Sequence, residues 1–320
     1  MNWIKKYWFL IGLALVFLVT LADMSELTAE AGRWAKQHYG PDLVICLVFF
    51  FSGMILDPAQ IRSGLKNVKG TVLALFLIFI VSPAISGVLV ALPMHTGIRI
   101  GLFLVAVMPT TLSSGVVMTA AAGGLMAHAL VITVIANLLS VVTIPVSLSL
   151  LLEMTGNDTT VIIDKVAVMT KIGLFVVLPL VSGLFVRSIL AQRVTRQGSR
   201  LQKANQLLIL CIVWMGIAQS KPVLLQSGAE LMYVALAVTG FHLALLSVAW
   251  TLLRLFHIPS GKRESILFMG IQKTLPLSVI LQVTLFPEYG LALLVCVAHH
   301  FISLMIDGFL VGRLKPAANS

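Results

Sequence analysis

Charged residues are scarce in this sequence of 320 residues: Asp, Glu, Lys and Arg make up only 11% of it, while hydrophobic residues make up 59%. Soluble domains carry about 25% charged residues. Together with a mean hydropathy of +1.03, this shortage of charge excludes water as the main solvent of the chain. We therefore expect the lipid bilayer to be the partner of most of its surface.

Cysteine is also rare, and the motifs of catalysis are missing. Cys46, Cys211 and Cys296 each lie within an apolar stretch, without the partners that a disulfide framework or a metal cluster needs, so we expect them to be packing residues. The sequence holds no HExxH motif, no nucleotide-binding loop and no pair of carboxylates within an apolar stretch. These absences argue against an enzyme and against a cofactor. An ion gradient or the solute's own gradient remains as the source of energy.

Apolar stretches fill nearly the whole chain. A bilayer core of about 30 Å requires roughly 20 apolar residues per helix. The predicted spans are 7–22, 41–56, 70–92, 98–123, 126–152, 166–187, 206–220, 231–256, 264–285 and 289–311. We predict an all-α polytopic membrane protein with ten transmembrane helices.

The distribution of basic residues predicts the orientation of these spans. If the N-terminus is cytoplasmic, most of the 22 Lys and Arg residues fall on the cytoplasmic side, as the positive-inside rule requires. Most of the 12 Asp and Glu residues fall on the other side, although acidic residues contribute little to the rule. We expect a multi-pass protein of the bacterial inner membrane with both termini in the cytoplasm. The basic loop from Arg187 to Lys203 has no aromatic residues, so it favours contact with anionic lipid over nucleic acid.

The chain divides into two halves of five spans. Residues 1–153 form the first repeat, 154–205 include the sixth span and the basic loop, and 166–320 form the second repeat. Because five is an odd number, the second half enters the membrane from the opposite side, and the two repeats are inverted. Inverted repeats with interrupted helices are typical of secondary transporters whose solute site lies near the midplane of the bilayer.

Two spans carry polar interruptions at corresponding places in the two halves. In the fourth span, the run from Met108 to Gly115 contains one proline and four hydroxyl side chains; in the ninth, the run from Gly270 to Pro276 contains Gln272 and Lys273. Proline removes a backbone donor, and glycine and hydroxyl groups let an unwound segment satisfy its backbone without water. We predict discontinuous helices 4 and 9 that together form a site for ions or small charged solutes.

Three stretches resemble a known family. They are FFFSGMILDPAQI (49–61), MPTTLSSGVVMTAAAGG (108–124) and GIQKTLPLSVIL (270–281), and they are similar to segments of the bile acid:sodium symporter superfamily, in particular of bacterial relatives of the seventh member of solute carrier family 10. The resemblance implies a panel domain of spans 1, 2, 6 and 7, and a core domain of spans 3 to 5 and 8 to 10 in which helices 4 and 9 cross. It also implies alternating access by movement of one domain against the other.

The resemblance further implies a sodium site behind the crossing, of which Ser114 and Gln272 are retained. At the other matched positions this chain has Gly115 for asparagine, His128 for serine, Phe268 for glutamate and Lys273 for asparagine. Hard cations need oxygen ligands, and these differences remove a carboxylate and add a cation. They argue against two-sodium coupling, and leave sodium or a proton as candidate coupling ions.

Lys273 has two interpretations. A lysine at the centre of a membrane helix costs roughly 2.5 to 3.5 kcal/mol on insertion scales, so something must compensate for its charge. In the first interpretation it replaces a bound cation, either by alternating between protonation states or by pairing with an anionic solute. In the second it is a permanent counter-charge to the carbonyl dipoles at the crossing.

The remaining polar residues of the spans give weaker indications. By its matched position His128 lies beside the crossing, where it carries a proton; the alternative is a hydrogen-bonded histidine near the cytoplasmic end of the span. His299 and His300 are close to the middle of the tenth span, and only one of them can face the core. Asn137 either joins the polar network or links helices.

Two charged residues near span ends are expected to lie outside the site. Asp307 is near the cytoplasmic end of the tenth span and Lys171 near the outer end of the sixth, so both can extend to the membrane interface.

We therefore predict a secondary active transporter of a small, anionic organic or inorganic solute that works by alternating access. The alternatives are a sodium-coupled symporter of the bile-acid type and a regulator of calcium homeostasis that transports nothing. The residues specify neither the solute nor the oligomeric state. The candidate solute- or ion-binding residues are Pro109, Thr110, Thr111, Ser113, Ser114, Thr119, His128, Gln272, Lys273, Thr274 and His299.

Overall fold

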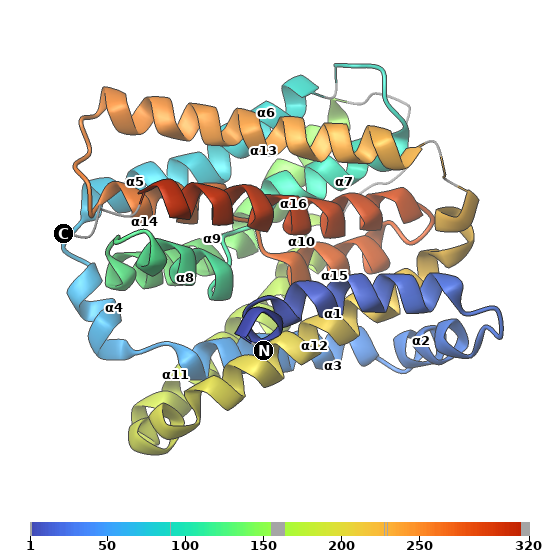
Figure 1. Ribbon diagram of the computed structural model, residues 1–320, viewed down its shortest axis with the longest axis horizontal. Helices are drawn as coiled ribbons and strands as arrows, with labels where there is room; N and C mark the ends of the chain where they lie inside the picture. Colours follow the sequence, from blue (N-terminus) through green and yellow to red (C-terminus); the bar gives the residue numbers. More distant parts are fainter. Residues whose placement is uncertain (1, 90, 155–163, 227, 229, 315–320) are drawn as a thin grey trace.

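The computed structural model describes the chain except for residues 1, 90, 155–163, 227, 229 and 315–320 (Figure 1). The described residues form helices and no strand. In the first part of the chain these are α1 (Asn2–Ala22), α2 (Leu27–Gln37), α3 (Gly40–Ile55), α4 (Pro58–Gly64), α5 (Val68–Phe76), the π-helix η1 (Leu77–Val81), α6 (Ser82–Leu89), α7 (Thr96–Val107) and α8 (Ser113–Ala121). The remainder forms α9 (Met126–Glu153), α10 (Lys165–Ile172), the π-helix η3 (Gly173–Val177), α11 (Leu178–Ile189), α12 (Ala191–Gln226), α13 (Glu230–Leu255), α14 (Arg263–Ile271), α15 (Leu275–Leu285) and α16 (Gly290–Leu314).

Each predicted span corresponds to one helix or to helices in series, and two short helices, α2 and α4, occupy segments predicted as loops. Seven helical segments of the described chain are long and apolar enough to cross a bilayer, and up to nine are if each of two bent pairs counts as one span. The bent pairs are α1 with α2, at 108°, and α3 with α4, at 73°. The predicted fourth span is divided into α7 and α8, of 12 and 9 residues, and neither piece alone has the length of a span.

The outer surface of the bundle is apolar, as a lipid-facing surface requires. Large hydrophobic side chains point outward along several helices, for example Leu18, Val88, Phe185 and Phe309, each more than 60% exposed. Contiguous exposed apolar surface of this kind is rare in soluble monomers. The chain is a multi-pass helical membrane protein.

Proline explains the two π-helical segments. Pro83 follows η1 and Pro179 follows η3. A proline ring collides with the carbonyl group four residues earlier, which belongs to Phe79 in η1 and to Phe175 in η3. The wider turn of a π-helix makes room for the ring, so both helices continue through the proline.

The helices fall into two packed groups. One contains α3, which packs against α11 and α12, while α12 also packs against α1 and α2. Its closest approach is at Gly53 of α3 and Gly183 of α11, where an added Cβ atom would lie only 2.1 Å from a carbonyl oxygen of the opposite helix. In the other group α16 packs against α7 and α13, and α14 against α5, α8 and α13.

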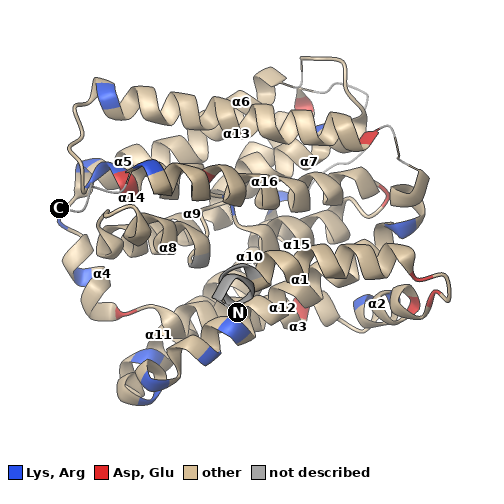
Figure 2. Cartoon of the chain, viewed as in Figure 1, with Lys and Arg blue, Asp and Glu red and all other residues tan. Residues whose placement is uncertain are grey.

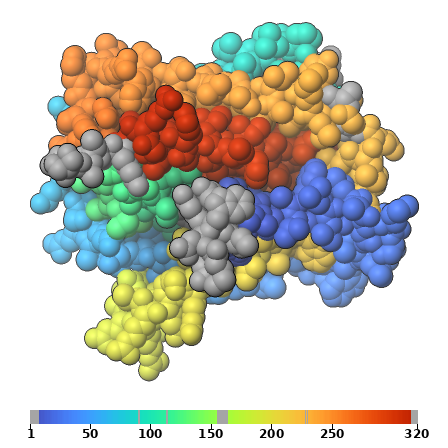
Figure 3. All heavy atoms as spheres, in the orientation of Figure 1, coloured from blue at the N-terminus to red at the C-terminus, as the bar shows by residue number. Residues whose placement is uncertain are grey.

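Charge is distributed unevenly along the bundle. Figure 2 shows Lys and Arg gathered around α4, α5, α14 and the junction of α11 with α12, at one end of the molecule, while most Asp and Glu lie at the other end. At the basic end, the start of α12 and the end of α11 project from the body of the bundle (Figure 3).

Candidate functional site

The two predicted breaks are present, and they touch. The chain leaves helical geometry between Val107 and Ser113, and again between Ile271 and Leu275. The backbone N–H of Thr274 donates to the carbonyl oxygen of Pro109 at 3.0 Å. The unwound segments therefore satisfy part of each other's backbone at the place where two pairs of half-helices meet.

The local sequence accounts for both breaks. Met108 is extended at the end of α7, as expected for a residue that precedes a proline. Gln272 and Thr274 are extended on either side of Lys273, and Pro276 lies in the first turn of α15, where its missing N–H group costs no hydrogen bond.

Lys273 makes three hydrogen bonds, all to backbone carbonyl groups. Its Nζ donates to the oxygens of Ile78 at 3.1 Å, Ala106 at 3.2 Å and Met108 at 3.1 Å. The residue is only 3% exposed. Since an ammonium group has three donors, none remains for a solute, and these contacts agree with the interpretation of Lys273 as a counter-charge to carbonyl dipoles.

A chain of buried hydrogen bonds links four helices behind the break in the ninth span. Ser114 of α8 donates to Gln272 Oε1 at 2.8 Å, and the Gln272 amide donates to Asp307 of α16. The other carboxylate oxygen of Asp307 is 3.0 Å from Nε2 of His242 in α13. Gln272, Asp307 and His242 are 0% exposed.

The prediction that Asp307 extends to the membrane interface is therefore wrong. The helix continues to Leu314, so Asp307 lies about two turns before its end and faces α13 and α14. Lys171, in contrast, is partly exposed and pairs with Asp42 at 3.0 Å, and its Nζ also donates to Thr284 at 3.2 Å.

The residues around Ser114 and Gln272 do not fit a sodium ion. Their two oxygens bind each other, and the Gln272 nitrogen, not its oxygen, faces the carboxylate of Asp307. Gly115 offers no ligand, and a Cβ atom there would lie 2.9 Å from Met269 Sδ. The sulfur of Met118 accepts from Gln272 at 3.6 Å. A hard cation needs several oxygen ligands, and here the oxygens of Ser114 and Gln272 bind each other, while the Asp307 carboxylate is bound by Gln272 and His242.

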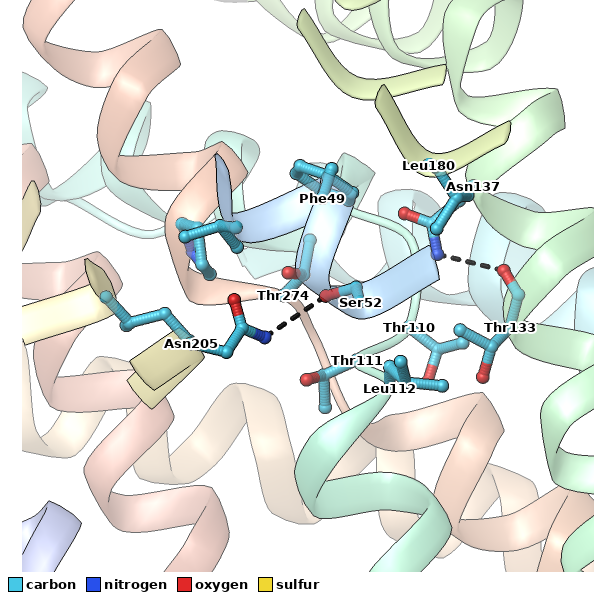
Figure 4. A pocket seen from close by; sticks show the side chains of 13 residues that line it. Phe49, Ser52, Thr110, Thr111, Leu112, Thr133, Asn137, Leu180, Asn205 and Thr274 are labelled. Atoms are coloured by element: carbon cyan, nitrogen blue, oxygen red, sulfur yellow. Dashed lines mark hydrogen bonds between the residues drawn. The ribbon is translucent and has the colours of Figure 1, made fainter. Parts of the chain in front are cut away.

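A pocket lies between the breaks and the helix group of α3, α11 and α12, and Figure 4 shows its lining. It encloses ≈ 430 Å³, including the part that opens to solvent. The lining residues are Val48, Phe49, Ser52, Thr110, Thr111, Leu112, Thr133, Asn137, Leu180, Asn205, Ile209, Thr274 and Pro276. None of these residues carries a charge, and Lys273 is not among them.

Several polar groups of this pocket lack a protein partner. The Asn205 amide donates to Ser52 Oγ at 3.2 Å and that of Asn137 to the Thr133 carbonyl at 2.9 Å, as the dashed lines in Figure 4 show. Within the described part of the chain, Oδ1 of both asparagines and Oγ1 of Thr110 are buried and unpartnered. Buried polar groups normally have a partner, so the pocket is prepared for a ligand or for water.

Two helices begin at the pocket. Thr111 and Leu112 lead into α8, and Thr274 and Pro276 into α15. The residues before them, Leu112 and Thr274, make no side-chain hydrogen bond to the first turn. The first N–H groups of a helix carry partial positive charge, so both helices present this charge near the pocket.

Some predicted site residues lie elsewhere. The ring nitrogens of His128 contact Ser265 Oγ at 2.7 Å and Thr71 Oγ1 at 3.1 Å, and Ser265 is about two turns of α14 from Gln272. Thr119 donates to the Gly115 carbonyl within its own helix at 2.8 Å. Ser113 begins α8, and its side chain lies outside the described part of the structure.

His299 and His300 differ in their surroundings. The His299 ring packs against Phe241 and His242, with centroids 5.5 Å apart in each pair, so it adjoins the Asp307 network, and its Nε2 is buried without a partner among the described residues. The His300 ring packs against Phe9, with ring centroids 6.1 Å apart, and its Nδ1 is buried without a partner in the part of the chain that the structure describes.

Four polar residues of the pocket were not predicted as site residues: Ser52, Thr133, Asn137 and Asn205. Asn137 was recognised only as a polar residue with two interpretations. Ser52 lies in the first of the three family-like stretches, which was the one signal available for it. Asn205 fell outside the predicted seventh span, which began at residue 206.

These features define a multi-pass helical membrane protein in which two broken helices meet beside a polar pocket. Residues 7–316 match the profile of the SBF-like CPA transporter family, and the chain belongs to that family. Similar proteins include the probable sodium/metabolite cotransporter BASS4, chloroplastic, of Arabidopsis thaliana, 29% identical over 92% of this chain and 70% of the relative. Its counterpart of the same name in Oryza sativa subsp. indica is 26% identical over 82% of this chain and 66% of the relative. Sodium/bile acid cotransporter 7-B of Xenopus laevis is 25% identical over 98% and 92%.

The comparisons confirm the predicted resemblance. The family and these relatives are membrane transporters and not enzymes, so a small solute or an ion is the substrate class that membership implies. The chain spans about two thirds of the length of the two plant relatives.

Proposed function

We propose that this protein is a secondary active transporter of a small organic anion, and that the pocket between the breaks and the α3, α11 and α12 group is its solute site. The observation that carries the proposal is the set of buried, unpartnered oxygens of Thr110, Asn137 and Asn205 in one pocket. They fit hydroxyl or amine groups of a solute, which would donate to them. Carrying such a solute through apolar surroundings would require these polar contacts.

The preference for an anion comes from helix ends and not from lysine. The uncapped N-terminal turns of α8 and α15 supply partial positive charge, and none of the residues lining the pocket is acidic. Lys273 contributes no free donor, because its three N–H groups bind carbonyl oxygens. A carboxylate solute with hydroxyl or amine substituents suits both features.

We further propose ten spans in two inverted repeats, residues 1–153 and 166–320, with both termini in the cytoplasm of a bacterium. The gathering of Lys and Arg at one end of the bundle supports this orientation (Figure 2). The pocket residues Val48 and Ser52 belong to the second half of α3, and Asn205 to the first half of α12. Both halves lead to the basic end, so the pocket faces the cytoplasm in this conformation.

Alternating access would move the α1, α3, α11 and α12 group, which corresponds to the panel of the family, against the core that holds the breaks. A contact at the acidic end crosses this boundary: Lys171 of α10 binds Asp42 of α3 and also Thr284 of α15. This contact closes the end opposite to the pocket. We propose a proton as the coupling ion in preference to sodium. The buried pair of Asp307 and His242 offers groups that can hold a proton, whereas the oxygens of Ser114 and Gln272 bind each other and leave no site for sodium.

The test is a binding screen followed by a transport measurement. Thermal unfolding of the detergent-purified protein is measured with small carboxylates that carry zero, one or two hydroxyl or amine groups. We expect saturable stabilisation by one class of substituted carboxylates, lost in Asn205→Leu and retained in Thr119→Val, whose hydroxyl is buried outside the pocket. If no anion stabilises the protein, or if Asn205→Leu responds like the wild type, the assignment of the pocket is wrong. A stable protein partner together with no response to solutes would favour a regulator.

A further inference from the structure

The carbonyl groups that surround Lys273 are oriented toward a single point. The oxygens of Ile78, Ala106 and Met108 come from two separate helical segments, and all three lie 3.1 to 3.2 Å from Nζ. None of the ion pairs found among the described residues involves Lys273. Carbonyl dipoles, and no carboxylate, therefore compensate for its charge.

Irregularities of the helices explain why these oxygens are available. Ala106 and Met108 lie at the end of α7, where the last carbonyl groups of a helix have no partner within it and carry partial negative charge. Ile78 lies in the π-helix η1, where the regular pattern of α-helical hydrogen bonds is interrupted. The Ser82 hydroxyl also donates to the Ala106 oxygen at 2.8 Å. The remaining lone pairs of the three carbonyl oxygens still require a hydrogen-bond donor.

We propose that these three carbonyl oxygens form a site for a monovalent cation, and that the ammonium group of Lys273 is its covalently attached occupant. Buried carbonyl groups that converge on one point replace the hydration shell of a small cation. Because the ammonium is part of the chain, its effective concentration at the site is high and independent of the medium. The positive charge behind the break is thus always present, and no ion from solution is needed there.

The proposal makes a specific prediction for a shortened side chain. Lys273→Ala removes the three methylene groups and the nitrogen beyond Cβ that together have the size of n-propylammonium. The cavity would keep its three carbonyl oxygens, so a free cation of matching shape could occupy it. Binding to the folded state raises stability in proportion to the logarithm of ligand concentration.

The experiment compares the thermal unfolding of detergent-purified wild type and Lys273→Ala in n-propylammonium, methylammonium, sodium and tetramethylammonium chloride at equal ionic strength. We expect Lys273→Ala to have a lower Tm than the wild type, and n-propylammonium to raise that Tm in proportion to the logarithm of its concentration. The wild type should show no such response, and tetramethylammonium, which has no N–H donor and is too wide, should act on neither protein. Lys171→Ala is the control, because it removes a partly exposed ammonium and its Tm should not rise with n-propylammonium concentration.

Two results would overturn the proposal. One is a folded Lys273→Ala protein that responds to none of the small cations, or that responds no more than Lys171→Ala does. The other comes from Lys273→Met, which fills the same space without charge and serves if the alanine variant does not fold. The proposal expects it to unfold at a lower temperature than the wild type, because three buried carbonyl groups lose their donor; equal Tm values would show that Lys273 only fills space. The readout is independent of transport, so it stands or fails separately from the proposed function.

Discussion

The backbone N–H of Thr274 donates to the carbonyl oxygen of Pro109 at 3.0 Å, although 165 positions separate the two residues in the chain. This hydrogen bond joins two unwound segments, each of which lacks regular partners of its own. It places Thr110 and Thr274 at one pocket, while Lys273, which lies within the second break, extends to carbonyl groups of Ile78, Ala106 and Met108 outside that lining. The pocket and the charge of Lys273 are therefore separate features of the same junction.

Thr110 and Thr119 form a matched pair for testing the pocket. The Thr110 hydroxyl is buried without a partner, so Thr110→Val should leave stability unchanged or raise it by up to about 1 kcal/mol. The same substitution should weaken stabilisation by the solute. Thr119→Val loses its hydrogen bond to the Gly115 carbonyl and should cost about 1 kcal/mol with the solute response intact. Unfolding curves of both variants with and without solute measure these effects. A solute response that is lost in Thr119→Val and kept in Thr110→Val would place the solute site elsewhere.

Asp307 should be sensitive to loss of its charge. In Asp307→Asn, one of the two donors from Gln272 and His242 would face an NH₂ group in place of an oxygen, so we expect a loss of about 1 to 3 kcal/mol. Asp164→Asn is the control, because Asp164 caps α10 from an exposed position and asparagine caps a helix equally well. Denaturation in detergent measures both, and equal stability of the two variants would argue against the buried network.

The acidic end of the bundle predicts a dependence of stability on pH. A hydrogen bond from Lys221, 2.7 Å from Glu26 Oε1, is the main cause that holds the pKa of Glu26 below its usual value of 4.5. A carboxyl group whose pKa is lowered by folding stabilises the folded state above its unfolded pKa and loses this contribution as the pH falls through the folded value. The Tm difference between wild type and Glu26→Gln should therefore be constant near neutral pH and shrink below about pH 4.5. A Tm difference that does not change with pH would contradict a stabilising role for the Glu26 carboxylate.

The contact between Lys171, Asp42 and Thr284 should hold the acidic end closed. Partly exposed ion pairs contribute up to about 1 kcal/mol, so Lys171→Ala should shift the conformational equilibrium roughly two- to five-fold. Thr111→Cys, in a variant without the three native cysteines, reports this shift through its rate of labelling by a membrane-impermeant maleimide from the acidic side. Lys165→Ala, on the same helix, is the control. Equal labelling rates in the two variants would show that the contact is no gate.

The breaks could be predicted from sequence because their cause is local. Pro109 and Pro276 are incompatible with a regular helix, and the hydroxyl and amide groups around them supply replacement hydrogen bonds. The position of Asp307 could not be predicted in this way. Its place near the end of an apolar stretch favoured the interface, and only the packing of α16 against α13 and beside the break after α14 shows that it faces Gln272 and His242.

Asn205 and His128 show two limits of prediction from sequence: the boundaries of helices, and contacts between residues that are distant in the chain. The basic run before Asn205 was predicted as a loop, yet Arg, Gln and Lys are good helix formers, and α12 begins at Ala191. Asn205 is therefore inside a helix that reaches the pocket. For His128 the structure shows the second of the two interpretations, a hydrogen-bonded histidine near the end of its span, and its partners Ser265 and Thr71 come from helical segments that sequence alone could not bring together.

Solute counterflow in sealed proteoliposomes tests the central claim most directly. Vesicles loaded with an unlabelled carboxylate found by the binding screen are diluted into a trace of the labelled compound. We predict a transient accumulation of label that requires the protein and persists in Thr119→Val. In Thr110→Val the accumulation should fall about ten-fold or more, which is about the change that loss of one well-placed hydrogen bond produces. Binding of the solute without any exchange of label, or exchange that is the same in both variants, would contradict a transport role for the pocket.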